Sequence, residues 1–573
     1  MVRKRETTAA QAVVEAFREE KVEYVFGLTG SHVLSITDAL ADVPEIRHIV
    51  VKQESNAAFM AGMYGYLTGR PGVVLVTAGP GATNSISGVA QAYASSLPMV
   101  HISGDVPLKA GNEAFHGVDR ADFLHKMFAD ITKWSVRIER PEEIPGVLSR
   151  AFALAASGRP GPVHVDIPVD IVRAADVEAA PYQRSAVEKQ VPTGQLVDRV
   201  RRALTAADRP LICAGRGVMI HRAGNELVAL AEALGAPVLC TEYSQGAIDQ
   251  AHPQFAGSIS EWTPNPFAES LMAEADFLLA VGLRSNTLLT DILVEHGPEN
   301  TILVALDEMN TLCAVEGMAS TAASDSQLFL ARLLERVDEF RRPPVPSRQE
   351  RVVQHRGAWK KGLALRMAEL EDAQPLHFGR VMLELAGRLD KDALVTAGVG
   401  HHNIWARELL HIRDRESFVQ EASWGTMGGE LGAGIAAKLV HPERQVVVVT
   451  GDGSLLMAAS DFVTAVEAGT NILVVVLNDS RYGIITSMQR EYYERSFGDE
   501  IGTIDFVRFA ESFGATGIRV ESPEALPDAV ARALALSAET PVILDAVCDY
   551  RYRWPDRPAI LAAGMEALGA SSL

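Results

Sequence analysis

The 573-residue sequence predicts an α/β protein with three doubly wound parallel-sheet domains and a short C-terminal tail. Short β-branched runs alternate with amphipathic helical segments along nearly the whole chain, as at 72–78, 98–104 and 445–453. Strands that are apolar throughout and separated by helices are typical of a parallel sheet covered on both faces. The longest apolar runs have the length of a strand, far short of the ~20 residues that a membrane span requires.

Two polar connectors divide these alternating segments into domains. The strand at 162–168 runs into a polar segment with Ala and Pro that reaches residue 183, and RRPPVPSRQE at 341–350 is Pro-rich and charged. The expected units are a first domain over 1–183, a Rossmann-like middle domain over 193–340, a third domain over 370–548 and a tail over 549–573.

The charge balance limits the classes of partner. Lys and Arg number 53 against 73 Asp and Glu, which gives a net charge of −20. This excess argues against nucleic-acid binding, and any phosphate-bearing ligand must be held by a local site. The basic N-terminus lacks the apolar core of a signal peptide, so we expect a cytoplasmic protein with no membrane partner. The cysteines at 213, 240, 313 and 548 form no CxxC pair and are expected to be buried thiols.

The third domain contains the strongest chemical motif. One strand ends in Gly-Asp-Gly-Ser at 451–454, and the next ends in Asn-Asp at 478–479. Side-chain oxygens of Asp452 and Asn478, with a backbone carbonyl near Ser480, suit Mg²⁺. The helix that starts within the first motif would direct free N–H groups at a diphosphate. The tetrapeptide alone would indicate an ordinary turn, but the second strand end favours the metal–diphosphate interpretation.

This pattern resembles the metal–diphosphate motif of thiamine-diphosphate enzymes, and the resemblance extends over about residues 8–548. KQESNAA and the following residues to 84 resemble the pyrimidine-binding domain of that family, and WGTMGGELGAGIAAKL at 424–439 resembles the segment that holds the aminopyrimidine. The resemblance implies thiamine diphosphate and Mg²⁺ as cofactors. It also implies active centres shared between two chains, and hence a homodimer or homotetramer.

The same resemblance assigns roles to individual residues. Glu54 maps onto the essential glutamate that shares a proton with the pyrimidine ring, and such a carboxyl should be desolvated. Met427 would support the bent cofactor, although a plain core role is the alternative, and the Gly425 carbonyl would accept a hydrogen bond from the amino group. The remaining expected cofactor contacts are Gly400, His401, Asp452, Gly453, Ser454, Asn478, Tyr482, Gly483 and Ile484.

Three side chains are candidates for proton transfer to or from the substrate. His32 lies in FGLTGSH, which resembles a stretch of benzaldehyde lyase, and His116 lies in AFHGVD, where that enzyme and acetolactate synthases have glutamine. Glu494, or alternatively Glu491, follows the metal loop in QREYYERSFGDE. A structural role for either histidine, and a surface position for either glutamate, are the alternatives.

Acetolactate synthase is the obvious relative, on the evidence of AFHGVDR, SGRPGPVHVDIP and DFVRFAESFGA. However, its FAD-binding loop is replaced by FAGSISEWTPNPFAES at 255–270, and Met488 stands where it has a substrate-contacting tryptophan, so no FAD is expected. Arginines at strand ends in the middle domain would instead suit the phosphates of coenzyme A, as in the acyl-CoA branch of the family. The candidates are Arg216, Arg222, Arg284 and, in the tail, Arg551 and Arg553, with ordinary surface positions as the alternative.

These features lead to one main hypothesis and two alternatives. The main hypothesis is a thiamine-diphosphate-dependent lyase that reversibly cleaves a 2-hydroxyacyl-CoA to a ketone or aldehyde and formyl-CoA, with the tail as a lid or a dimer-packing strap. The pattern most resembles the actinobacterial type of this lyase, which acts on 2-hydroxyisobutyryl-CoA. The first alternative is a carboligase or decarboxylase acting on free 2-keto acids or 2-hydroxy ketones, with His32 as its best support. The second is a non-catalytic relative, which the intact Glu54, Asp452 and Asn478 argue against.

Overall fold

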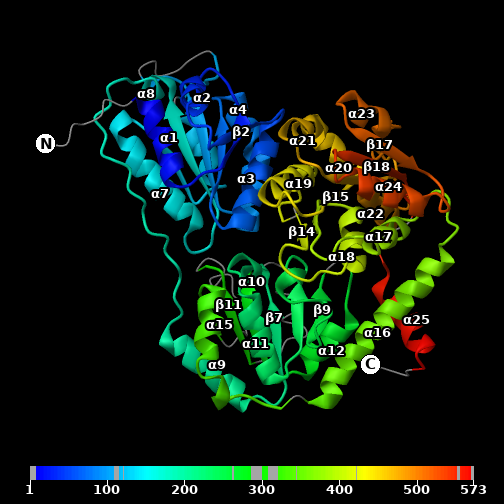
Figure 1. The fold of residues 1–573 in the computed structure, drawn as a ribbon. Helices are drawn as coiled ribbons and strands as arrows, with labels where there is room; N and C mark the ends of the chain where they lie inside the picture. Colours follow the sequence, from blue (N-terminus) through cyan, green and yellow to red (C-terminus); the bar gives the residue numbers. More distant parts are fainter. Residues whose placement is uncertain are drawn as a thin grey trace.

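The computed structural model describes residues 8–108, 115–120, 122–260, 263–284, 300–307, 320–343, 345–420, 423–551 and 555–569. Within these residues the chain forms three parallel sheets of six strands each, with helices on both faces (Figure 1). This arrangement confirms the predicted fold class. Among the described residues, no helix is both long and apolar enough to span a lipid bilayer.

The first sheet has the strand order β2-β1-β3-β4-β6-β5. Its strands are β1 Tyr24–Leu28, β2 Arg47–Val50, β3 Gly72–Val76, β4 Met99–Asp105, β5 Trp134–Arg137 and β6 Pro162–Pro168. The helices are α1 Ala9–Glu19, α2 Leu34–Ala41, α3 Glu54–Thr68, α4 Pro80–Asn84, α5 Ile86–Ser95, α6 Phe123–Ala129, α7 Ile144–Ala156 and α8 Val169–Val172. Strands β3, β4 and β6 are buried along their whole length; β3 is apolar throughout, whereas β4 and β6 also carry buried polar side chains such as His101 and His164.

The middle sheet has the order β12-β11-β10-β7-β8-β9. Its strands are β7 Pro210–Ala214, β8 Val238–Thr241, β9 Phe255–Ile259, β10 Phe277–Leu283, β11 Thr301–Ala305 and β12 Ser320–Ala323. Its helices are α9 Gly194–Ala206, α10 Arg216–Ile220, α11 Gly224–Leu234, α12 Pro266–Glu274 and α15 Ser326–Leu334. Cys213, Cys240 and, in the third domain, Cys548 are buried free thiols, as expected, whereas Cys313 lies outside the described residues.

The third sheet has the order β14-β13-β15-β16-β18-β17. Its strands are β13 Leu394–Ala397, β14 Phe418–Gln420, β15 Val446–Gly451, β16 Leu473–Asn478, β17 Thr516–Val520 and β18 Val542–Val547. Its helices are α17 Phe378–Ala386, α18 His401–Leu409, α19 Gly429–Val440, α20 Asp452–Ala458, α21 Phe462–Ala468, α22 Gly483–Tyr493, α23 Phe506–Ser512 and α24 Leu526–Leu536. The charged connector between the middle and third domains continues into a long helix, α16 (Pro346–Glu369).

The tail forms helix α25 (Arg557–Ala567), which lies alongside α16 (Figure 1). The two helices cross where both carry glycine. A Cβ atom at Gly362 would meet the Ile560 carbonyl oxygen at 1.8 Å, and one at Gly564 would meet the Ala358 carbonyl oxygen at 1.8 Å. Backbones that approach this closely leave no room for side chains, so this part of the tail is docked on the linker helix.

The first and third domains contact each other through α3 and α19. Phe59 packs against the helix at Gly429 and Gly432, whose absent side chains allow the close approach. At one edge of this contact, the Asn56 amide nitrogen donates to an Asp461 carboxylate oxygen at 2.6 Å.

Candidate functional site

A cavity of about 230 Å³ lies at the carboxyl edge of the third sheet. This is the edge at which ligands bind in open parallel sheets, because the loops and helix N-termini that follow the strands face it. Its lining residues are Phe378, Val399, Gly400, His401, His402, Gly425, Met427, Gly451, Asp452, Gly453, Ser454, Leu477, Asp479, Arg481, Tyr482, Gly483, Ile484 and Ile485. The structure therefore brings together every expected cofactor contact except Asn478.

Two carboxylates face this cavity. Asp452 follows β15 and is buried; its Oδ1 accepts a hydrogen bond from the Gly453 amide at 2.9 Å, and its Oδ2 has no hydrogen-bond partner among the described residues. Burial raises the pKa of Asp452 to about 6. Burial, and then the neighbouring Asp452 charge, raise the pKa of Asp479 well above its usual value. The nearby Arg481 pairs instead with Asp499 and Glu500, so the two acids lack a cationic partner from this side chain.

The structure corrects the expectation for Asn478. The Asn478 amide nitrogen donates to Asp545 Oδ1 at 2.9 Å, and its oxygen accepts from the Ser480 amide at 3.2 Å. The nitrogen and the oxygen of the Asn478 amide are therefore both engaged in hydrogen bonds within the protein. Neither Asn478 nor Ser480 lines the cavity. Asp479, the next residue, takes the position facing Asp452.

A third buried acid, Glu430, does not line the cavity but bonds to Ser454, which does. Its Oε1 accepts hydrogen bonds from Thr450 and Ser454, both at 2.5 Å. The Ser454 hydroxyl in turn accepts from the Gly428 amide at 2.9 Å. Burial raises the pKa of Glu430. These contacts connect β15, α20 and the turn before α19, so they fix the positions of these three elements relative to one another.

Backbone amides and glycines shape the rest of the cavity. Helix α18 begins directly after Gly400 and presents its N-terminus to the cavity, where an anion is favoured. A Cβ atom at Gly453 would lie 2.7 Å from the Tyr482 ring, so only glycine fits this turn. His402 is buried beside the same helix start, and burial lowers its pKa to about 3, which keeps its ring neutral.

Glu54 lies in the first domain, at the carboxyl edge of its own sheet. Its side chain is only 7% exposed, as the sequence led us to expect, and it begins α3. The Asn84 amide nitrogen donates to Glu54 Oε2 at 3.0 Å. A Cβ atom at Gly81 would lie 3.5 Å from Glu54 Oε1, so the start of α4 passes over the carboxyl group.

His32 and His116 are neighbours at the same edge of the first domain. Their ring centroids are 4.9 Å apart and the rings are nearly perpendicular. His116 adopts a left-handed backbone conformation, and its Nδ1 lies 3.1 Å from the Ala78 carbonyl oxygen in the turn that leads to α4. His32 is buried, with Nδ1 3.0 Å from the Ser31 hydroxyl. The structure therefore gathers Glu54 and both histidines around one turn, which their positions in the sequence do not reveal.

Within a single chain, Glu494 does not lie in a pocket as expected. Glu494 is exposed at the C-terminus of α22 and lines none of the cavity, and Glu491 is exposed one turn earlier. Around them the surface is apolar, because Tyr492, Tyr493 and Phe497 are 66%, 70% and 88% exposed.

The arginines expected to bind coenzyme A contact the protein itself. Arg216 Nε donates to the Ser95 carbonyl at 3.1 Å, and Arg284 Nη1 donates to the Ala94 carbonyl at 2.9 Å, both at the C-terminus of α5. Arg551 pairs with Asp549, and Arg553 lies outside the described residues. These middle-domain side chains join two domains at a helix C-terminus, where cations are favoured, and their role in binding coenzyme A stays a prediction.

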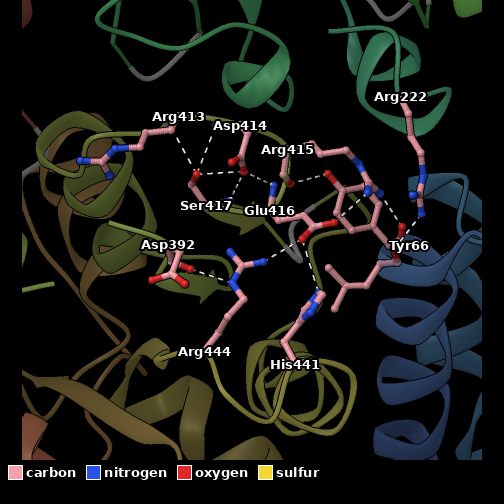
Figure 2. Close-up of polar contacts among 11 residues, drawn as sticks. Tyr66, Arg222, Asp392, Arg413, Asp414, Arg415, Glu416, Ser417, His441 and Arg444 are labelled. Carbon is pink, nitrogen blue, oxygen red and sulfur yellow. Dashed lines mark hydrogen bonds and ion pairs between the residues drawn. The ribbon is translucent and has the colours of Figure 1, made fainter. Parts of the chain in front are cut away.

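Arg222 belongs to a similar junction, where all three domains meet (Figure 2). Arg222 Nη2 donates to the Leu67 carbonyl at 2.7 Å, near the C-terminus of α3. The adjacent Tyr66 hydroxyl donates to the Arg415 carbonyl at 2.6 Å, and the Arg415 guanidinium lies 4.1 Å from the centre of the Tyr66 ring. Glu416 then accepts from Arg444 at 2.7 Å (Figure 2).

The domain-joining role of Arg216 predicts a loss of stability. Arg216→Met should lower the free energy of unfolding by about 1–2 kcal/mol, because it leaves a carbonyl at the interface without its donor. Thermal or urea unfolding measures this change. Arg508→Met is the control, since Arg508 is 85% exposed and its ion pair should contribute little. Equal stability of both variants would contradict the domain-joining role.

Comparison with known proteins gives matches over all three domains. The N-terminal TPP binding domain of thiamine pyrophosphate enzymes matches residues 7–125, their central domain matches 197–333, and their C-terminal TPP binding domain matches 398–546. A probable acetolactate synthase large subunit of Methanocaldococcus jannaschii is 31% identical, with 94% of this chain and 92% of the relative covered. Acetolactate synthase isozyme 3 large subunit of Escherichia coli is 33% identical over 92% of both chains. The mitochondrial acetolactate synthase catalytic subunit of Saccharomyces cerevisiae is 30% identical over 95% of this chain and 81% of its own.

Proposed function

Because the chain belongs to the thiamine pyrophosphate enzyme family, we propose that it uses thiamine diphosphate to break and form carbon–carbon bonds beside a carbonyl group. The observation that carries this proposal is the cavity of the third domain, where two acids meet a helix N-terminus. The relatives at about 30% identity are named acetolactate synthases, which favours free 2-keto acids as substrates over acyl-CoA thioesters.

The residues of the cavity fit a diphosphate bound together with a divalent cation. Asp452 and Asp479 would supply hard oxygen ligands. Burial raises the pKa of each and so disfavours its charged form, which a bound cation would stabilise. The start of α18 and the glycine turn at Gly453 would hold the diphosphate oxygens. Thiamine diphosphate supplies, when bound, an electron sink for the carbanion left by bond cleavage. Glu54 would exchange a proton with the pyrimidine ring, and Met427 would support that ring.

We infer that the complete site requires two chains. The cavity is lined from the third domain alone, and Glu54 and the histidine pair lie at the edge of the first domain. Exposed apolar side chains lie close to both edges, with Phe115 65% exposed beside His116 and Phe497 88% exposed beyond α22. Such surfaces are typical of an interface between subunits. A homodimer would join each cavity to Glu54 of the partner subunit.

Substrate assays test the proposed reaction directly. With thiamine diphosphate and Mg²⁺, pyruvate should be consumed with release of carbon dioxide and formation of a ligated 2-hydroxy ketone product. Mass spectrometry of the product and a coupled assay for carbon dioxide measure this reaction. Absence of turnover with pyruvate and with longer 2-keto acids would contradict the 2-keto acid assignment.

A 2-hydroxyacyl-CoA lyase is the second candidate. His32 alone supports a carboligase, but its contact with His116 adds a second imidazole that a lyase would use for proton transfer. Two imidazoles 4.9 Å apart could accept the proton of a substrate hydroxyl and return it to the product carbon. This reaction would release formyl-CoA from 2-hydroxyisobutyryl-CoA, whereas the first candidate would leave that thioester intact. The arginine contacts give this candidate no further support, because Arg216, Arg222 and Arg284 already bind backbone carbonyls.

A further inference from the structure

A second cavity, of about 360 Å³, lies where the middle domain meets the linker helix α16, helix α18 and the tail helix α25. It shares no lining residue with the cofactor cavity. Its size lies within the range of small-molecule sites, although it is too small for a dinucleotide or coenzyme A. The cavity sits between domains, a common place for ligand binding.

The polar group that marks this cavity as a site is His355 on α16. Its side chain is 4% exposed, and neither ring nitrogen has a hydrogen-bond partner among the described residues. The ring stacks on Phe267 with 4.3 Å between centroids, so its orientation is fixed. Burial, followed by the charges of Arg557 and Arg356, lowers the pKa of His355 to about 3. The neutral ring therefore offers one donor and one acceptor without partners, whereas buried polar groups are usually satisfied.

The charge around His355 favours an anion. The lining contains the cations Arg356, Lys360, Arg407 and Arg557 and the carboxylate of Glu408. Arg407 is already paired with Glu242, so the excess positive charge comes from Arg356 and Lys360. Arg557 Nη2 pairs with Glu408 at 2.6 Å, but its buried Nε has no hydrogen-bond partner among the residues described.

The remaining walls are apolar. They are formed mainly by Phe255, Trp359, Leu363, Met367, Leu383 and Leu410. A ligand that complements both the cationic end and the apolar walls carries an anionic oxygen group at one end and a hydrocarbon body at the other. A phosphate ester would bring a doubly charged, strongly hydrated group to a cavity whose area is mostly hydrocarbon, so a carboxylate fits better.

We propose that this cavity binds a small aliphatic carboxylate, with the carboxylate beside His355 and Arg557 and the chain against the α16 wall. We further propose that α18 couples this cavity to the cofactor cavity. The start of α18 lines the third-domain cavity through Gly400, His401 and His402. Its end and the two residues that follow, 407–411, line the carboxylate cavity. A ligand that shifts this helix at one end acts on the other, and the effect is reciprocal. The coupling, unlike the binding, rests on the proposed cofactor site.

Isothermal titration of the full chain with hexanoate tests the binding. Hexanoate should bind, and hexanamide, which has the same size without the charge, should bind at least about tenfold more weakly. His355→Phe keeps the stacking on Phe267 but removes both nitrogens, and should lose about tenfold in hexanoate affinity. His355→Gln, which keeps a donor and an acceptor, should retain most of it. His48→Phe, which removes a half-buried imidazole from the first domain, should change nothing.

Three results would overturn the binding proposal: no heat with hexanoate, equal affinity for hexanamide, or unchanged hexanoate affinity in both His355 variants. The coupling is tested by measuring thiamine diphosphate affinity, in Mg²⁺, with and without saturating hexanoate. A shift in the wild type that disappears in His355→Phe supports the coupling, and an unchanged affinity overturns it. Failure of the cofactor to bind even without hexanoate would instead contradict the proposed function, so the two failures are distinguishable.

Discussion

Glu54→Gln is expected to lower kcat by about 10²–10⁴-fold while leaving the fold intact. Glutamine has the shape of glutamate and can keep the contact with Asn84, but it cannot exchange a proton with the cofactor ring. Steady-state turnover on the accepted substrate measures the loss, and circular dichroism checks the fold.

Glu45→Gln is the matched control for this change, because Glu45 is an exposed partner of Arg18 on the same domain. Its turnover should equal that of the wild type. If the turnover of Glu54→Gln lay within about twofold of the wild type, this result would contradict a proton-transfer role for Glu54.

Asp479→Ala is expected to weaken Mg²⁺-dependent binding of thiamine diphosphate by at least about 10²-fold, since one of two carboxylate ligands is lost. Asn478→Ala should instead lower the free energy of unfolding by about 1–3 kcal/mol, because it leaves the buried Asp545 with one donor fewer. Calorimetric titration and thermal unfolding, carried out on both variants, separate these effects. If Asn478→Ala abolished metal-dependent binding and Asp479→Ala did not, the assignment of the two residues would be reversed.

The pattern of the sequence predicts the sheets well because central strands such as β3 and β16 are buried on both faces and are therefore apolar along nearly all of their length. It also predicts which loops meet at the third-domain cavity, since loops that follow parallel strands share one edge. Side chains on a strand alternate in direction, however, and at the end of β16 the sequence does not show which of Asn478 and Asp479 turns toward that edge. The pairing of β16 with β18 sets Asn478 opposite Val547 and brings its amide within hydrogen-bond distance of Asp545, two residues earlier on β18, which leaves Asp479 for the cavity.

The arginine assignments stay predictions for a different reason. A cation at a strand end looks the same in sequence whether it meets a ligand or another domain. Arg216 and Arg284 lie at the expected strand ends. Their guanidinium groups, however, donate to carbonyls at the C-terminus of α5, more than a hundred residues earlier in the chain. The contact between His32 and His116 is equally non-local, because the turn before α4 brings them together.

Complementation between Glu54→Gln and Asp479→Ala tests most directly the claim that the two halves of the site come from different chains. Each variant alone should be inactive. In a mixed dimer, one site combines the intact Glu54 with the intact Asp479, and the other site contains both substitutions. Co-expression with random pairing should therefore restore about a quarter of the wild-type activity per chain. Mixed dimers that stay as inactive as either variant would contradict the shared site.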